Sequence, residues 1–271
     1  MAGLFGMFDP TREGPGVSKN APQKKRFFLF FEIYFRKFSK IILLNIIYFL
    51  VCIPLVTIGP ATAAMTYCMR NFAREEHADL SDFFDQFKKN FWQGLAIGTI
   101  LSVSFGIVIF GLFFYFALYQ AGNFLGLVGF CLCVTAAFVL LFMSYYIYML
   151  MVTFKMTIRQ LLKNSFLFSF IGLGRNIITT IILVFVYGWF LICGVLQLIL
   201  PLYTDFVPSL SSACLAFTMY IFFIPSLGSF VTNFNIYPCV KQVLIDPAMK
   251  ELEEQRAQQE KIFEDQEFDE E

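Results

Sequence analysis

The chain has 271 residues, of which 58% are hydrophobic, 19% aromatic and only 15% charged, with 20 acidic side chains balancing 20 Lys and Arg. A soluble domain has about 25% charged residues, so this composition excludes an ordinary soluble fold. No Asp, Glu, Lys, Arg or His occurs in 41–69, 93–154, 176–204 or 206–240. The second of these stretches has 62 residues, enough for two helices of the ~20 residues that cross a bilayer. The sequence therefore predicts an all-α, polytopic membrane protein.

The N-terminus is basic. Residues 1–40 carry eight Lys and Arg against three acids, and we expect 1–26 to form a cytoplasmic segment beside anionic lipid. No cleavable signal peptide is expected, because a long polar segment precedes the first apolar run. Helical spacing in 27–40 then gathers aromatic residues on one face and Glu32, Arg36 and Lys40 on the other, which predicts a helix lying in the headgroup layer.

The stretch CIPLVTIGPATAAM at 52–65 decides the predicted topology. If the chain crosses the membrane once here, it has five crossings in all. With a cytoplasmic N-terminus, 12 Lys and Arg would then lie outside and 8 inside, contrary to the positive-inside rule. If the chain turns back and returns through 61–73, all 20 are cytoplasmic. We therefore expect a hairpin at about 41–73, with both chain termini inside. The residues expected to make and satisfy its turn are Pro54, Thr57, Gly59, Pro60 and Thr62.

The return leg of this hairpin is short. From Pro60 to Ala73 a helix would span about 21 Å, against a hydrocarbon core of ~30 Å. The leg is thus either a short return helix or a re-entrant segment shielded by other helices. Arg70 and Arg74 are expected to extend to the cytoplasmic surface.

Two further amphipathic stretches, 78–92 and 157–170, precede hairpins expected at 94–154 and 177–232. Asp79 is the expected N-cap of the first stretch. A basic residue followed by Asn stands before each hairpin, which indicates either a duplicated unit or only the cytoplasmic boundary. The candidate cytoplasmic interface comprises Phe84, Phe87, Lys88, Lys89, Asn90, Arg175 and Asn176.

Helix packing is predicted from a stripe of small residues. Gly94, Gly98, Ser102 and Gly106 recur every fourth position, which allows close approach to another helix, more plausibly of the same chain than of a second subunit. Asn45 and Gln197 are the costliest neutral groups to bury and are expected to bond between helices.

Residues 242–271 form an acidic cytoplasmic tail, expected to be a solvated helix or a partner-binding segment.

The predicted spans contain no Asp, Glu, His or Arg at membrane depth. Proton relays and ion-coupled pumps need such groups at membrane depth, and His77, the only histidine, lies in a polar loop. We therefore predict no enzyme, catalytic residue, metal or cofactor. A passage for a neutral solute could be lined by Ser and Thr with Tyr145, Tyr146 and Tyr148, although an interfacial aromatic belt explains these tyrosines equally well.

Two sequence stretches carry a family resemblance. LLNIIYFLVCIPLVTIGPATAAMTY and RNFAREEHADLSDFFDQFKKNFWQ resemble the YesL-like family of bacterial integral membrane proteins, over about 36–240. The resemblance implies a location in the bacterial cytoplasmic membrane and a link to carbohydrate uptake and glycan breakdown. It assigns no catalytic residues.

Two functions follow as expectations. The first is a non-enzymatic accessory or regulatory component of carbohydrate uptake, with membrane transporter subunits or another protein as partner. The alternative is a permease or facilitator for a small neutral solute. Neither involves nucleic acid, and the sequence leaves the oligomeric state open.

Overall fold

A computed structural model describes residues 25–203 and 210–269, with side chains for 25–188 and 223–258. Most of the predicted basic segment 1–26, the side chain of Gln197 and the end of the predicted tail 242–271 lie outside these ranges. The described residues form helices and turns without a strand, which confirms the all-α prediction for this part of the chain.

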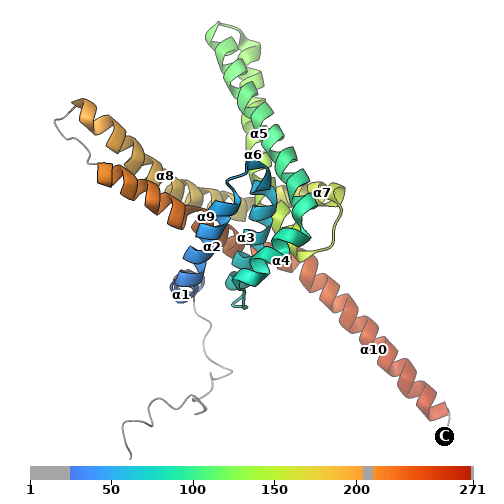
Figure 1. Ribbon diagram of the computed structural model, residues 1–271. Helices are drawn as coiled ribbons and strands as arrows, with labels where there is room; N and C mark the ends of the chain where they lie inside the picture. Colours follow the sequence, from blue (N-terminus) through green and yellow to red (C-terminus); the bar gives the residue numbers. More distant parts are fainter. Residues whose placement is uncertain (1–24, 204–209, 270–271) are drawn as a thin grey trace, which may run out of the picture.

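The helices form two long hairpins and a shorter one. In chain order they are α1 (Arg26–Arg36), α2 (Phe38–Val51), the short η2 (Leu55–Thr57), α3 (Ile58–Ala73), α4 (Leu80–Lys89), α5 (Phe91–Gln120), α6 (Phe124–Thr153), α7 (Ile158–Ile171), α8 (Leu173–Tyr203), α9 (Leu210–Val240), η3 (Lys241–Ile245) and α10 (Asp246–Asp269). Figure 1 shows the hairpins α5–α6 and α8–α9 leaving a common base in different directions, with α2 and α3 between them and α10 pointing away.

Two helices of the described part are each long and apolar enough to cross a membrane, namely α5 and α6 with 30 residues each. A helix of this length spans about 45 Å, more than the ~30 Å of a hydrocarbon core. Helix α7 and the start of α8 (Leu173–Gly188) have the required length and composition only together, and the chain bends by 88° between them. These apolar helices indicate a helical membrane protein.

The turn of the short hairpin lies earlier than Gly59-Pro60, where we expected it. Helix α2 ends at Val51, the chain turns through 52–57, and α3 begins at Ile58. Pro54 disfavours helical geometry in the residue before it, which ends α2. Pro60 instead fits within the first turn of α3, where its missing N–H leaves no hydrogen bond unmade.

Helix α3 occupies the centre of the base. Twelve of its 16 residues are buried, and it contacts α4, α5, α6 and α9. Ala61, Ala63 and Ala64 are fully buried, and such small side chains allow neighbouring helices to approach closely. The short return leg is therefore shielded by protein.

The backbones of α3 and α5 approach each other closely in the base. A Cβ atom added to Gly59 would lie 2.1 Å from the carbonyl oxygen of Gly94, and one added to Gly98 would lie 2.9 Å from the Cα of Gly59. The other half of the predicted stripe makes no such contact, since Ser102 is exposed and Gly106 has no heavy atom within 4 Å of an added Cβ. The stripe thus packs within the chain over its first two positions only.

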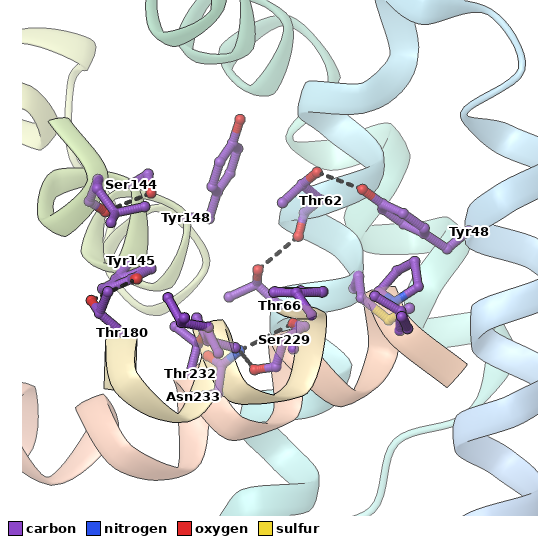
Figure 2. A pocket seen from close by; sticks show the side chains of 18 of the residues that line it. Tyr48, Thr62, Thr66, Ser144, Tyr145, Tyr148, Thr180, Ser229, Thr232 and Asn233 are labelled. Atoms are coloured by element: carbon purple, nitrogen blue, oxygen red, sulfur yellow. Dashed lines mark hydrogen bonds between the residues drawn. The ribbon is translucent and has the colours of Figure 1, made fainter. Parts of the chain in front are cut away.

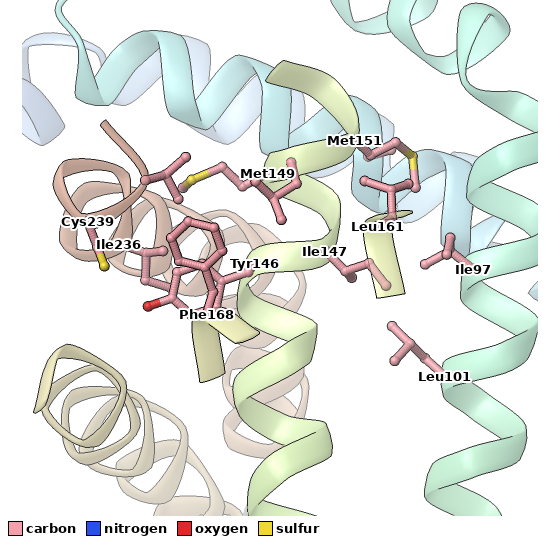
Figure 3. Close-up of a cluster of buried hydrophobic side chains, with 13 residues drawn as sticks. Ile97, Leu101, Tyr146, Ile147, Met149, Met151, Leu161, Phe168, Ile236 and Cys239 are labelled. Atoms are coloured by element: carbon pink, nitrogen blue, oxygen red, sulfur yellow. The ribbon is translucent and has the colours of Figure 1, made fainter. Parts of the chain in front are cut away.

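An apolar cluster fixes α6 to its neighbours. Figure 3 shows Tyr146 and Ile147 of α6 amid side chains of α5, α7 and α9. The Tyr146 ring stacks on Phe168 of α7, with the ring centroids 5.1 Å apart. A second cluster surrounds α3 and includes Ile33 and Phe230 from α1 and α9.

The basic segments meet at this base. Two arginines contact α9: Arg26 of α1 donates to the carbonyl oxygen of Phe234 over 2.9 Å, and Arg74 lies over the ring of Tyr237. Gln93, near the start of α5, donates over 2.6 Å to the carbonyl oxygen of Met156, in the loop that follows α6. Lys40 lies 2.6 Å from Asp79. Its hydrogen bond holds the pKa of the Asp79 carboxyl below the usual value. The ends of the three hairpins therefore gather on one side of the molecule.

The amphipathic stretches form separate helices, and the first is split. A break at Lys37 divides 27–40 into α1 and the start of α2. Phe30 packs against Phe230 and Phe234 of α9, whereas Phe27 and Phe35 are about two-thirds exposed. Part of the predicted apolar face is therefore used within the chain. Asp79 does cap α4, with its backbone N–H donating to Asp82.

Candidate functional site: a cavity between the hairpins

A cavity of about 750 Å³ lies where the short hairpin meets the two long ones. Side chains of α2, α3, α6, α8 and α9 line it, and Figure 2 shows many of them. None of the described lining residues is acidic, basic or histidine, and together they carry hydroxyl groups from Ser, Thr and Tyr and one side-chain amide. The volume falls within the roughly 300–1,000 Å³ of small-molecule sites.

Helix α3 presents two threonines to the cavity, one helical turn apart. The hydroxyl of Thr62 donates to the carbonyl oxygen of Ile58, and that of Thr66 donates to the carbonyl oxygen of Thr62, each over 2.7 Å. The hydroxyl of Tyr48 lies 3.1 Å from that of Thr62. Because the threonine hydrogens point back along α3, their oxygen lone pairs remain as acceptors on the cavity side.

Helix α6 forms the opposite wall. The hydroxyl of Ser144 donates to the carbonyl oxygen of Leu141, and Tyr145 bonds across the cavity edge to Thr180 of α8 over 3.0 Å. Tyr148 stands between the two walls in Figure 2, and its hydroxyl forms no hydrogen bond with a described residue. This hydroxyl is thus free to donate to a ligand.

Helix α9 contributes a side-chain amide, that of Asn233. Asn233 is only 2% exposed, and its Nδ2 donates to the carbonyl oxygen of Ser229 over 2.7 Å. Its Oδ1 is buried and has no hydrogen-bond partner in the described part of the chain. A buried acceptor left unpaired costs about 1–3 kcal/mol. A donor supplied by a ligand or by water would remove this cost.

The lining therefore suits an uncharged ligand rich in donors. It offers acceptor oxygens on two walls and a buried amide acceptor, with tyrosine rings for apolar contact. No lining group can neutralise a ligand charge, and an unpaired charge is costly away from water. A small polyhydroxylated molecule has both the donors and the neutrality that this arrangement requires.

Of the polar groups singled out in the sequence, Asn45 forms a contact between helices. It is fully buried, and its Oδ1 accepts from the backbone N–H of Ser226 in α9 over 2.8 Å. Ser226 follows Pro225, whose ring disturbs the helical hydrogen bonds around it. Asn45 thus joins α2 to α9 and does not line the cavity.

The predicted turn residues divide between the turn and the cavity. Thr57 donates to the carbonyl oxygens of Val51 and Pro54, so it satisfies backbone groups released at the turn. Gly59 and Pro60 pack against α5. Within this set Thr62 alone lines the cavity.

The residues of the candidate cytoplasmic interface differ in exposure, because some lie on the surface and others are buried. Phe84, Lys88 and Lys89 are exposed on α4, and Phe87 is half-buried. Asn90 is 8% exposed and donates to Gln86. Asn176 is fully buried and lies at the elbow between α7 and α8, where it accepts from the Tyr146 hydroxyl over 2.7 Å and donates to the carbonyl oxygen of Ser169 over 3.1 Å.

Arg70 does not extend to the surface as we expected, since it is only 6% exposed. It donates to the carbonyl oxygen of Val152 over 3.0 Å and to the hydroxyl of Thr153 over 2.9 Å. These acceptors lie at the end of α6, where carbonyl groups lack helical partners and favour a cation. Arg70 therefore ties α3 to α6.

The predicted solute passage is partly present in the cavity lining. Tyr145 and Tyr148 line it, whereas Tyr146 points to Asn176. Asn233 was not among the residues predicted to line it, because the expected span ended at residue 232 and α9 continues to Val240. In the described residues no group of three or more His, Cys, Asp or Glu is placed to hold a metal ion.

Comparison with known proteins gives one match. Residues 41–112 match the model of a family described as "Protein of unknown function, DUF624". No curated protein and no solved structure matches the chain. The matched residues include the short hairpin, α4 and most of α5, and so contain the Gly59–Gly94 contact and the α3 wall of the cavity. Residues 41–112 are thus similar to the DUF624 family, which is consistent with the resemblance of the sequence to the YesL-like proteins of that family.

Proposed function

We propose that this chain is a non-enzymatic membrane protein that binds a small, neutral, polyhydroxylated solute in the cavity between its hairpins, as a permease or facilitator. The observation that carries the proposal is the uncharged lining of the described residues, in which hydroxyl groups stand among apolar side chains, with the buried, unpaired Oδ1 of Asn233. Membrane transport of ions or protons would need acidic, basic or histidine side chains at this depth. The described lining residues include none of these.

The proposed topology places both termini in the cytoplasm of a bacterial cell, with four crossings by α5, α6, α8 and α9 and a re-entrant short hairpin. Helices α2 and α3 have 14 and 16 residues, about 21 and 24 Å, too short to cross ~30 Å of hydrocarbon. At their tip Ile53, Leu55 and Val56 are 68%, 79% and 67% exposed. Such an apolar tip is suited to end within lipid. The gathering of the basic segments at one base supports the orientation.

An accessory role in carbohydrate uptake is the second candidate. The resemblance suggests the carbohydrate link, and helix α10 supports a partner contact, because every residue in 246–258 is exposed. The exposed residues Phe84, Lys88 and Lys89 on α4 offer a further surface for a transporter subunit. A solute bound in the cavity could then control this partner instead of crossing the membrane.

Replacing Asn233 with leucine tests the solute site. We expect purified wild-type protein in liposomes to be stabilised by glycerol, erythritol or a monosaccharide in a saturable way. Asn233→Leu should bind the same solute about five- to tenfold more weakly, because one hydrogen bond is lost. Thr135→Val is the matched control, since Thr135 is exposed on α6 and bonds only to Cys131 of its own helix. Melting temperature against solute concentration is the measurement.

A stopped-flow flux assay on the same liposomes separates the two candidates. Solute flux that falls with Asn233→Leu but not with Thr135→Val supports a facilitator. Saturable binding without flux favours the accessory role, which pull-downs of carbohydrate-uptake subunits from native membranes would then support. The absence of saturable binding to every solute would contradict the cavity proposal.

A further inference from the structure

Two arginines, Arg26 and Arg175, lie beside α9 at the base. Arg26 and Arg175 contact consecutive residues of α9, since Arg26 donates to the carbonyl oxygen of Phe234 over 2.9 Å and Asn235 donates to the carbonyl oxygen of Arg175 over 3.1 Å. Arg26 also lies over the Phe234 ring, 5.4 Å from its centroid. Burial and the nearby positive charge of Arg175 lower the pKa of Arg26.

Three acidic residues of the base are already paired with other cations: Glu75 with Arg36, Glu76 with Arg74, and Asp79 with Lys40. The Nη1 of Arg175 is buried and has no hydrogen-bond partner in the described part of the chain. A buried donor of a charged group is costly to leave unpaired, so the position favours an added anion.

The surroundings add to the attraction for an anion. Arg175 lies in the first turn of α8, a helix of 31 residues that begins at Leu173. The N-terminus of a helix carries unpaired N–H groups and a partial positive charge, which favour phosphate. Arginine also matches the planar, two-point geometry of phosphate oxygens.

The same position faces the expected membrane surface. Beside Arg26, the side chains of Phe27 and Phe28 are 68% and 64% exposed, and on α7 Phe170 and Ile171 are 53% and 49% exposed. Exposed aromatic residues of amphipathic helices insert at the boundary of headgroups and acyl chains. Phosphate groups of lipids lie at this depth.

We propose that Arg26 and Arg175 form a binding site for a phosphate group, supplied by the headgroup of an anionic phospholipid of the inner leaflet. The two guanidinium groups bind the phosphate oxygens from two sides, and the aromatic residues of α1 contact the acyl chains. The lipid thereby links α1 to the start of α8, and this role is independent of the solute cavity.

Lipid binding to the full chain tests this site. The detergent-purified protein is titrated with phosphatidylglycerol and with phosphatidylcholine, and bound lipid is counted by native mass spectrometry. We expect phosphatidylglycerol to bind more tightly, with Arg26→Gln and Arg175→Gln each weakening it about tenfold, as loss of a charged hydrogen bond predicts. Arg36→Gln is the matched control, because Arg36 lies on the same helix and is already paired with Glu75.

Two further measurements identify the source of the phosphate and control for a poorly folded variant. Inorganic phosphate that binds as tightly, and is lost in the same variants, would replace the lipid by a soluble ligand and overturn the lipid assignment. Arg175→Lys keeps the charge and should retain part of the affinity if Arg175→Gln is poorly folded. Equal binding of both lipids, or unchanged binding in Arg26→Gln and Arg175→Gln, would overturn the proposal.

Discussion

Replacing Gly59 with alanine is expected to lower the stability of the fold strongly. The new Cβ would lie 2.1 Å from the carbonyl oxygen and 2.8 Å from the carbonyl carbon of Gly94. Both are backbone atoms, so α3 and α5 must separate to admit it. Overpacking of this kind costs about 1–3 kcal/mol, occasionally more. Denaturant unfolding of the purified protein in detergent measures the loss.

Gly106→Ala is the matched control for this substitution. Gly106 lies on α5 in the same stripe as Gly94, but an added Cβ would meet no heavy atom within 4 Å. Alanine is about 0.5–1 kcal/mol more favourable than glycine in a helix interior, so this variant should be as stable as wild type or slightly more so. Equal losses in Gly59→Ala and Gly106→Ala would contradict the close contact of α3 with α5.

Asn176→Leu should destabilise the elbow between α7 and α8. The leucine leaves the Tyr146 hydroxyl and the carbonyl oxygen of Ser169 without their hydrogen-bond partner. Each unpaired buried group costs about 1–3 kcal/mol, so we expect a loss of roughly 2–5 kcal/mol after some relaxation. Thermal or denaturant unfolding measures it.

A double-mutant cycle with Tyr146→Phe identifies the interaction. Tyr146→Phe removes the hydroxyl that donates to Asn176 but retains the ring that stacks on Phe168. The two substitutions together should cost less than the sum of their separate effects, because they remove the same bond. Strict additivity would mean that Asn176 does not hold α6 to the elbow.

Charge patterning predicted the general plan of the fold. The all-helical structure, the short hairpin around 52–57 and the two long hairpins follow from the apolar stretches and from the positions of Lys and Arg. The buried contact of Asn45 with α9 follows from the cost of an unpaired amide in an apolar run. These features are predictable because each has one dominant cause that can be read in the sequence. For the helices it is the exclusion of charged residues from the membrane, and for Asn45 it is the cost of an unpaired buried amide.

Other features depend on which helices meet, and the sequence does not specify this. Pro60 was expected at the turn, yet it is equally compatible with the first turn of α3, where packing against Gly94 holds it. Arg70 was expected at the surface because the free carbonyl groups at the end of α6 were not foreseeable as its partners. Asn233 was missed because α9 extends eight residues beyond the expected end at 232.

The cavity changes the order of the functional hypotheses. From the sequence, an accessory role came first, because no residue marked a solute site. The buried acceptor of Asn233 and the hydroxyl-bearing walls of α3 and α6 now favour solute binding. The match of 41–112 to DUF624 adds no activity, so the cavity is the basis for the proposed function.

Solute protection of a cysteine in the cavity tests the central claim most directly. Thr232→Cys, in a chain whose native cysteines are replaced, places a thiol in the lining, and Gly122→Cys places one between α5 and α6. A small neutral thiol reagent should modify Cys at 232 several-fold more slowly when the stabilising polyol is saturating, with no change at 122. Equal rates with and without every polyol tested at 232 would contradict a solute site between the hairpins.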